Sequence, residues 1–115
     1  MEPVLFDAFL QSTGATNEDL ELDRVPPGQR WTLHHVAAED ETTAFTSLRL
    51  GIKRGTTFLP LEEQKSPAAA TLYSSQDPWF LEEGNRLVAR FNGTTSGDKL
   101  RLYANGVVTL VGPQE

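Results

Sequence analysis

The chain has 115 residues, a formal net charge of −6 and no cysteine. A chain of this length is expected to form one domain, spanning residues 1–115, around a single core. The negative charge argues against a general nucleic-acid-binding protein, whose phosphate contacts need clustered Lys and Arg. The lack of cysteine excludes disulfides, thiolate catalysis and cysteine-ligated metals.

Membrane association is not expected from the sequence. No apolar run approaches the ~20 residues that a membrane-spanning helix needs. The first residues, "MEPVLFDAFLQ", lack the basic start and long apolar stretch of a signal peptide. We therefore expect a chain that is made in a cytoplasm and has no membrane partner.

Alternation of apolar and polar residues predicts short strands along the whole chain, and a period of two indicates half-buried strands in antiparallel sheets. Residues 16–23 and 66–75 also fit a helical turn. The alternation of Leu20 and Leu22 favours a strand in the first segment, and Thr71, Tyr73 and the closing serines favour extended structure in the second. In chain order, the expected strands lie near Val4–Leu10, Asp19–Arg24, 31–37, 47–53, Thr57–Glu62, Ala69–Ser74, 86–91, 99–104 and Val107–Val111.

The N-terminal segment, residues 1–11, has two interpretations. It is either the first strand of the domain or an arm that docks on a neighbouring molecule, with Phe6 and Phe9 at the contact. An ordinary first strand is the favoured interpretation.

Turn residues separate nearly all of these strands. Asn105-Gly106 predicts a tight hairpin, because Asn and Gly adopt positive φ at little cost, and "NGTTSGD" (92–98) predicts a longer loop. The turn before Trp31, with Gly28 and Arg30, is repeated 56 residues later by Gly84, Asn85 and Arg86. Two halves of a sandwich wound together produce such an echo, and so does chance.

About eight short strands without a sustained helical period predict an all-β fold. The expected architecture is an antiparallel β-sandwich of the jelly-roll type.

Catalytic and metal-binding patterns are missing from the sequence. His34 and His35 are neighbours in a predicted strand, so they should point to opposite faces, one partly buried and one on the surface. The carboxylate runs Glu39-Asp40-Glu41, Glu62-Glu63 and Glu82-Glu83 are typical of solvated edges and loop tips. The loop "GTTSGD" lacks the lysine and the spacing of a phosphate-binding loop. We therefore predict no catalytic residue, cofactor or metal ion, and no enzymatic activity.

Aromatic residues later in the chain supply a further candidate contact face. Trp79 and Phe80 are adjacent, so one ring should enter the core while the other points away. With Tyr73 or Tyr103, an exposed ring here could stack on a sugar or anchor a protein interface. In the favoured alternative, both Trp31 and Trp79 are core residues at sheet ends.

Two segments, "VPPGQRWTL" and "LEEGNRLVARFNGTTSGDKLRLYANGVVTL", resemble small jelly-roll structural proteins of tailed bacteriophages over residues 25–111. Gly28-Gln29-Arg30-Trp31 matches the first turn of their layout, and Leu81, Gly84 and Leu87 match a later Leu-x-x-Gly-x-x-Leu turn. The resemblance implies a non-enzymatic capsid decoration (cement) or head–tail accessory protein. It would assemble in the host cytoplasm, reside in the virion, form a homo-oligomer, with a trimer favoured, and bind the major capsid or another virion protein.

Two other functions fit the sequence less well. A carbohydrate- or receptor-binding sandwich would use Trp79, Phe80, Tyr73 or Tyr103 as a stacking platform. A small cupin-like enzyme would need a cluster of His and Glu metal ligands, which the sequence lacks.

Overall fold

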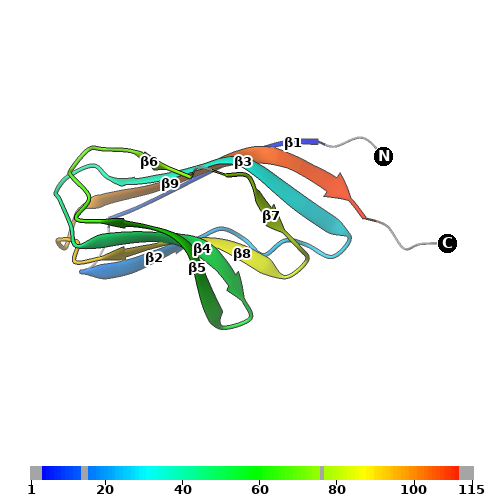
Figure 1. Cartoon of the computed structure of the whole chain (residues 1–115), viewed down its shortest axis with the longest axis horizontal. Helices are drawn as coiled ribbons and strands as arrows, with labels where there is room; N and C mark the ends of the chain where they lie inside the picture. The colour runs from blue at the N-terminus through cyan, green and yellow to red at the C-terminus, as the bar shows by residue number, and fades with distance from the viewer. Residues whose placement is uncertain (1–3, 14–15, 76, 112–115) are drawn as a thin grey trace.

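The computed structural model describes residues 4–13, 16–75 and 77–111. These residues form nine strands in two antiparallel sheets that pack face to face (Figure 1), which confirms the predicted all-β sandwich. Sheet A contains, in order, β1 (Val4–Thr13), β9 (Lys99–Leu110), β3 (Gln29–Asp40) and β6 (Tyr73–Ser74), with β7 (Trp79–Leu81) also paired to β3. Sheet B contains β2 (Asn17–Glu21), β8 (Asn85–Asn92), β4 (Ser47–Arg54) and β5 (Thr57–Lys65) in that order.

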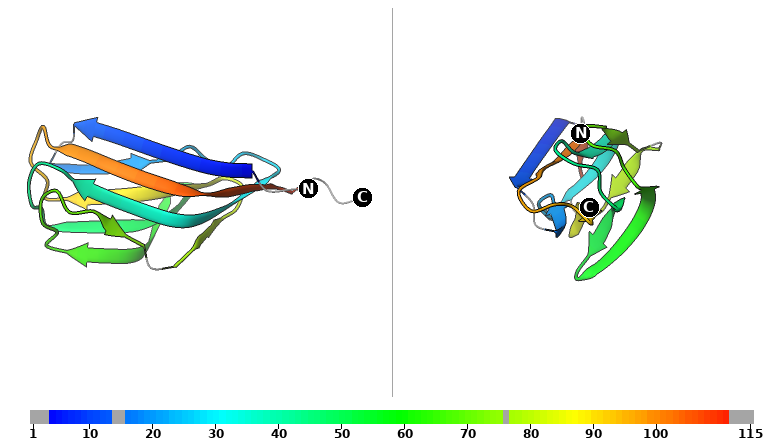
Figure 2. Two further views of the ribbon diagram at one scale, coloured as in Figure 1. Left: turned by 90° about the horizontal axis from the view of Figure 1, so that it is seen from above. Right: turned by 90° about the vertical axis from the view of Figure 1, so that its left-hand side faces the viewer.

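The strand pairs are nested along the chain. β1 pairs with β9, β2 with β8, β3 with both β6 and β7, and β4 with β5. The chain therefore resembles one long hairpin with its tip at the β4–β5 turn, wound so that successive pairs alternate between the two sheets. The strands run roughly along the long axis of the molecule (Figure 2), which measures 52 Å against 25 and 21 Å.

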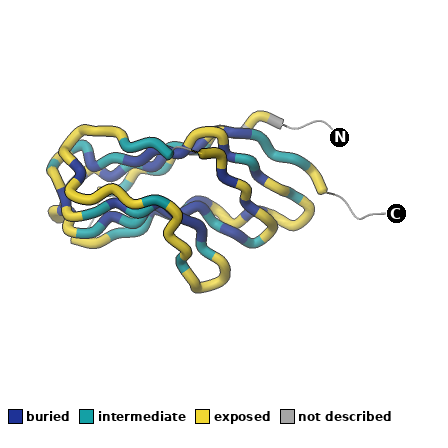
Figure 3. Tube along the Cα trace, viewed as in Figure 1, coloured by how far each residue is buried: buried dark blue, intermediate teal, exposed yellow. Residues whose placement is uncertain are grey.

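The core lies between the sheets and follows the predicted alternation. The inward positions of β4, β8 and the first half of β9 are buried in one cluster between the sheets (Figure 3): Leu48, Leu50, Ile52, Leu87, Ala89, Phe91, Leu100, Leu102 and Ala104. Each fully buried large side chain stabilises the fold by roughly 1.5–3 kcal/mol relative to an exposed one. The period-two pattern therefore identified the faces of these three strands correctly.

The predicted hairpin at Asn105-Gly106 is wrong. β9 continues through both residues, so the two strands expected at 99–104 and Val107–Val111 are one. Gly106 is needed for a different reason, because a Cβ at this position would overlap the backbone carbonyl oxygen of Thr32 on β3. The glycine permits close approach of two backbones beside an irregularity in β3.

That irregularity is a β-bulge at the two histidines. The register of β3 against β9 shifts between Leu33 and His35. Trp31 and Leu33 face the core as predicted, but beyond the bulge the inward residues are Val36 and Ala38. Both His34 and His35 are exposed, so the prediction that they face opposite sides is wrong. The extra residue changes the phase of the alternation.

The remaining boundaries differ in smaller ways. Only Tyr73–Ser74 of the strand predicted at Ala69–Ser74 is formed, and β2 begins and ends a few residues early. Residues 93–98 form a loop, but it crosses from sheet B to sheet A instead of closing a hairpin. Residues 4–13 form an ordinary edge strand paired with β9.

The repeated Gly-x-Arg turns occupy corresponding places in the two sheets. Gly28 and Gly84 both have positive φ, 80° and 85°, and they open the interior strands β3 and β8. The two turns also contact each other, because the Gly84 N–H donates to the Val25 carbonyl at 2.9 Å and Arg30 pairs with Glu82 at 3.0 Å. The echo in the sequence therefore marks one end of the sandwich, where both sheets begin an interior strand.

Candidate interaction face

The structure separates the aromatic residues that the sequence proposed as one surface. Phe80 and Phe9 are 62% and 52% exposed, and they lie with the half-buried Tyr103 on the outer side of sheet A. Trp79 is only 4% exposed and belongs to the core, as does Trp31. The interpretation that both tryptophans are core residues is confirmed, and Trp79 is removed from the candidate face.

The other two proposed residues do not join this surface. Tyr73 lies opposite Ala38, packs against the core, and its hydroxyl accepts a hydrogen bond from the Ala68 N–H at 3.1 Å. The backbone of Phe6 pairs with Gly106, and its side chain lies outside the described residues. The candidate face therefore contains Phe9, Phe80 and Tyr103.

The strand register shows how apolar residues gather on the outer surface of sheet A, which we call the A face. One row across four strands is Leu5, Val107, Thr32 and Phe80, in which Leu5 is 86% exposed. A second row contains Phe9 and Tyr103, whose ring centroids are 5.0 Å apart at an interplanar angle of 42°. The apolar residues of the A face are Leu5, Phe9, Phe80, Tyr103 and Val107.

A polar row separates the two apolar rows. Asp7, Asn105 and His35 lie opposite one another across β1, β9 and β3. His34, at the bulge, lines a shallow depression with Asp7 and Asn105. Within the described residues no group of three or more His, Asp or Glu side chains is placed to hold a metal ion.

Ion pairs mark both ends of the A face. At one end, Arg101 pairs with Glu39 and Glu41. At the other end, Arg30 pairs with Glu82 at 3.0 Å. Apolar rows within a charged periphery are a mixture of apolar and polar groups of the kind found in many protein–protein interfaces.

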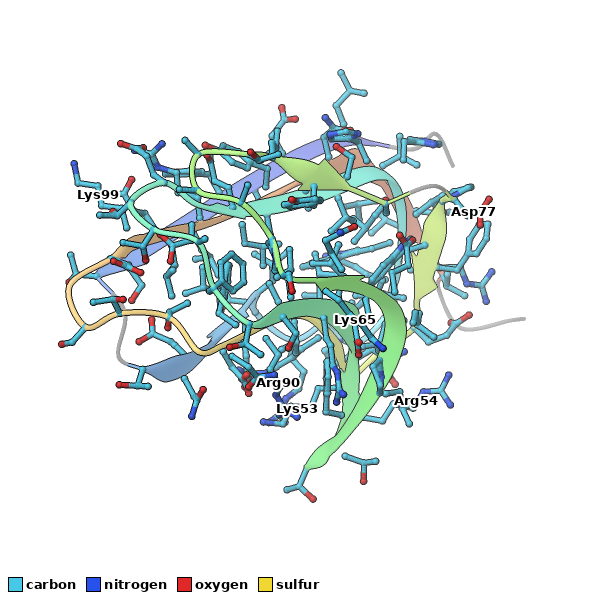
Figure 4. The ribbon with its side chains drawn as sticks, turned by 60° about the vertical axis from the view of Figure 1, so that its left-hand side comes forward. Lys53, Arg54, Lys65, Asp77, Arg90 and Lys99 are labelled. Atoms are coloured by element: carbon cyan, nitrogen blue, oxygen red, sulfur yellow. The ribbon has the colours of Figure 1, made fainter. Side chains whose placement is uncertain are left out.

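The outer surface of sheet B, the B face, is covered by ion pairs instead. Arg90 makes two hydrogen bonds to Asp19, at 2.9 and 3.0 Å, and its guanidinium carbon lies 4.2 Å from the ring centroid of Phe58. Lys53 pairs with Glu21 at 3.0 Å, and both Lys53 and Arg90 extend from the outer side of sheet B (Figure 4). Glu21 also accepts from Arg86, and Arg49 pairs with Glu63.

The two outer faces therefore differ in the free energy of docking on another molecule. Each exposed ion pair contributes only ~0–1 kcal/mol to stability. Removing such pairs from water is nevertheless unfavourable, because both charges lose hydration. Burying the apolar rows of the A face is favourable, at roughly 25 cal/mol per Å². The A face is the better contact surface.

A pair of buried carboxyl groups joins two loops at the end of the sandwich. Asp40 is fully buried at the end of β3, and Asp98 is 2% exposed before β9. Asp40 Oδ1 accepts hydrogen bonds from the backbone N–H groups of Thr42 and Thr43, at 2.9 and 3.1 Å. Asp98 accepts from the Thr43 hydroxyl and from the N–H of Thr95. The prediction that the 39–41 carboxylates are all solvated is wrong for Asp40.

When Asp40 holds a proton, it can donate that proton to Asp98 in a hydrogen bond. Burial first, and then the hydrogen bond with Asp98, raises the pKa of Asp40 to about 6. Burial also acts to raise the pKa of Asp98, but hydrogen bonds from Asp40 and Thr43 and from the Thr95 N–H hold it below its ordinary value. Asp40 Oδ2 has no other hydrogen-bond donor in the described part of the chain. The pair is buried, and its hydrogen bonds to Thr43 connect the loop after β3 to the loop before β9.

A groove opens between the edges of the two sheets, beside β5 and β6. Its volume is about 420 Å³, and the core residues Leu48 and Leu50 line it from sheet B. Leu72 and Tyr73 line it from the other sheet edge, and Glu62 adds a carboxylate. The groove offers an apolar floor with polar groups at its rim.

Comparison with known proteins gives no relative for this chain. No family model matches it, and neither a curated protein nor a solved structure is similar to it. The described residues contain no helix long and apolar enough to cross a membrane.

Sequence reasoning missed two features of these surfaces. Leu5 and Val107 were not proposed for the A face, although Leu5 shares the odd-numbered positions of Phe9 on the same strand. Extending the alternation from Phe9 would have found Leu5. The pairing of Asp40 with Asp98 has no sequence signal, because it depends on two loops that are distant along the chain.

Proposed function

We propose that the chain is a non-enzymatic structural subunit of a virion, a capsid decoration or accessory protein. It binds the major shell or another virion protein through the A face and associates with copies of itself, with a trimer favoured by the resemblance to phage proteins. The contrast between the apolar A face and the ion-paired B face carries the proposal, because it gives the molecule one side suited to contact and one suited to water.

The strand order supports this proposal. Nested pairing of first with last and second with second-last strands, alternating between two sheets, is the order expected of a jelly roll, with β7 as an addition. Jelly rolls are common in viral structural proteins, but they also occur in lectin domains and in enzymes. The fold therefore supports a virion role without selecting it, and the A face adds a surface through which such a subunit could dock.

The charge of the chain is consistent with this role. A subunit on the outside of a shell must not bind the nucleic acid inside, and a net charge of −6 disfavours phosphate contacts. The protein would be assembled into particles in the host cytoplasm and leave with them.

The test is the protein content of virus particles. Particles would be purified on a density gradient from a culture of the organism that encodes the chain, and quantified by mass spectrometry. The chain is expected in a fixed ratio to the major shell protein. Expression of the chain in the culture without its presence in any particle would overturn the proposal.

A carbohydrate- or receptor-binding module is the second candidate, and the groove between β5 and β6 favours it. Tyr73, Glu62 and Gln64 line a space of a size suited to a sugar. A glycan array would separate the two functions. Specific retention of a glycan that is lost on Tyr73→Ala, with the fold intact, would support this candidate over the first.

A further inference from the structure

The four edges of the two sheets are not equally protected against pairing with another strand. Exposed edges are usually shortened, charged, bulged or interrupted by proline, because an open edge is a template for another strand. β6 and β7 have only two and three residues, and β5 contains Pro60 and a bulge at Leu61, opposite Leu50–Gly51. β2 has five residues, of which three are acidic: Glu18, Asp19 and Glu21.

β1 has none of these protections. It has ten residues in unbroken register with β9, no proline, no lysine and one charged residue, Asp7. No other strand in the described part of the chain pairs with its second edge. Leu5 and Phe9, which are both more than half exposed, project from this strand. β1 is therefore the edge on which another strand is expected.

Hydrogen bonds at the ends of β9 show which backbone groups of β1 are open. The Val111 N–H donates to the Gly28 carbonyl at 2.7 Å, and the Lys99 carbonyl accepts from the Glu41 N–H at 2.9 Å. The backbone N–H and C=O groups of the odd-numbered residues of β9 therefore point toward β3, and those of the even-numbered residues point toward β1. In β1 the even-numbered residues face β9, which leaves the N–H and C=O groups of the odd-numbered residues 5–13 pointing outward.

We infer that this open edge pairs, antiparallel, with β1 of a second copy of the chain across a two-fold axis. Identical strands are self-complementary in this arrangement, so the contact closes without exposing a further edge. A two-fold axis at Phe9 places Asp7 opposite Gln11 of the second copy. An axis at Asp7 would place two like charges directly opposite each other, which is destabilising.

Charge also favours the axis at Phe9. Arg101 Nε donates to the Gln11 side chain at 3.1 Å, so a cation lies next to the position that Asp7 of the second copy would face. The pairing joins two sheets A into one continuous sheet. A two-fold axis perpendicular to that sheet leaves both A faces on the same side of the assembly, whatever the A face binds.

The inference predicts an even number of chains in solution. Two-fold pairing alone gives a dimer, and two-fold pairing of two trimers gives a hexamer. The pairing does not depend on the virion proposal, and the two can fail separately. A lone monomer or trimer would overturn the pairing and leave the virion role standing, whereas absence from particles would overturn only the virion role.

The experiment compares Gln11→Pro with Gln11→Ala by light scattering on a sizing column. Both variants lose the hydrogen bond to Arg101, but only proline also removes an outward N–H. Because that N–H points away from β9, the ladder within sheet A is retained. Gln11→Pro is expected to have half the mass of the wild type, and Gln11→Ala the wild-type mass. An unchanged mass for Gln11→Pro would overturn the inference.

A second variant covers the case in which Gln11→Pro fails to fold. Phe9→Lys places two ammonium groups opposite each other at the two-fold axis and leaves the backbone unaltered. It should also halve the mass, with a far-UV circular dichroism spectrum like that of the wild type. Retention of the full mass by a folded Phe9→Lys protein would contradict pairing at this edge.

Discussion

Substitution of Asp40 by Asn tests the proposed proton sharing at the buried carboxyl pair. Asp40 is fully buried and faces Asp98, and the N–H groups of Thr42 and Thr43 donate to Asp40 Oδ1. The Asn side chain keeps an acceptor for these donors and presents an amide, in place of a shared proton, to Asp98. It therefore imitates the protonated form of Asp40 at every pH.

The size of the effect follows from the pKa of Asp40, which is about 6 in the folded protein against 3.8 for an ordinary aspartate. Between these values the native state holds the proton more tightly than the unfolded state does. The stabilisation is complete below pH 3.8 and is lost as the pH rises through 6. At ~1.4 kcal/mol per pKa unit, the loss amounts to about 3 kcal/mol of unfolding free energy.

Urea unfolding at several pH values between 4 and 8 measures this difference, with the fluorescence of the buried Trp31 and Trp79 as the signal. Asp40→Asn is expected to match the wild type near pH 4 and to be more stable by about 1–3 kcal/mol at pH 8. Asp77→Asn, at an exposed position, is the control for the change in net charge. A difference between Asp40→Asn and wild type that does not vary with pH would refute proton sharing.

Three further substitutions test the fold and the two outer faces, with the midpoint of thermal or urea unfolding as the measurement. Gly106→Ala should destabilise by at least about 2 kcal/mol because of overlap with the facing backbone, whereas Asn105→Ala, at an exposed position, should change stability by less than ~0.5 kcal/mol. Trp79→Ala should lower the free energy of unfolding by about 3–5 kcal/mol because it truncates a core side chain, and Phe80→Ala should lower it by less than about 1 kcal/mol. Equal effects would contradict the placement of Trp79 in the core and of Phe80 on the surface. Arg90→Met should cost about 1 kcal/mol, and less at high salt, because it removes a bidentate ion pair.

The fold class was predictable because the core is encoded locally. Apolar residues recur at every second position of β4 and β8, so their inward residues could be read directly from the sequence. The hairpin at Asn105-Gly106 was mispredicted because the same dipeptide serves two purposes, a tight turn and close backbone approach. The choice between these depends on the bulge in β3, which lies about 70 residues earlier in the chain and leaves no mark in the local pattern.

The candidate face was only partly predictable. The alternation indicated that Trp79 and Phe80 point in opposite directions, and the structure decides which of them is exposed. Phe9 and Tyr103 are distant along the chain and became neighbours through the pairing of β1 with β9. The ion pairs of the B face follow from cross-strand register in the same way, because Asp19 and Arg90 meet only when β2 pairs with β8.

Cosedimentation with virus particles tests the proposed docking through the A face. Purified wild-type chain, Phe80→Ser and Leu61→Ser would each be mixed with gradient-purified particles that lack bound subunit. Leu61 is a matched control, because it is 58% exposed against 62% for Phe80 but lies on β5 of the other sheet. Wild type and Leu61→Ser are expected to sediment with the particles, and Phe80→Ser is expected to stay in solution. Equal binding by Phe80→Ser, or loss of binding by Leu61→Ser alone, would contradict it.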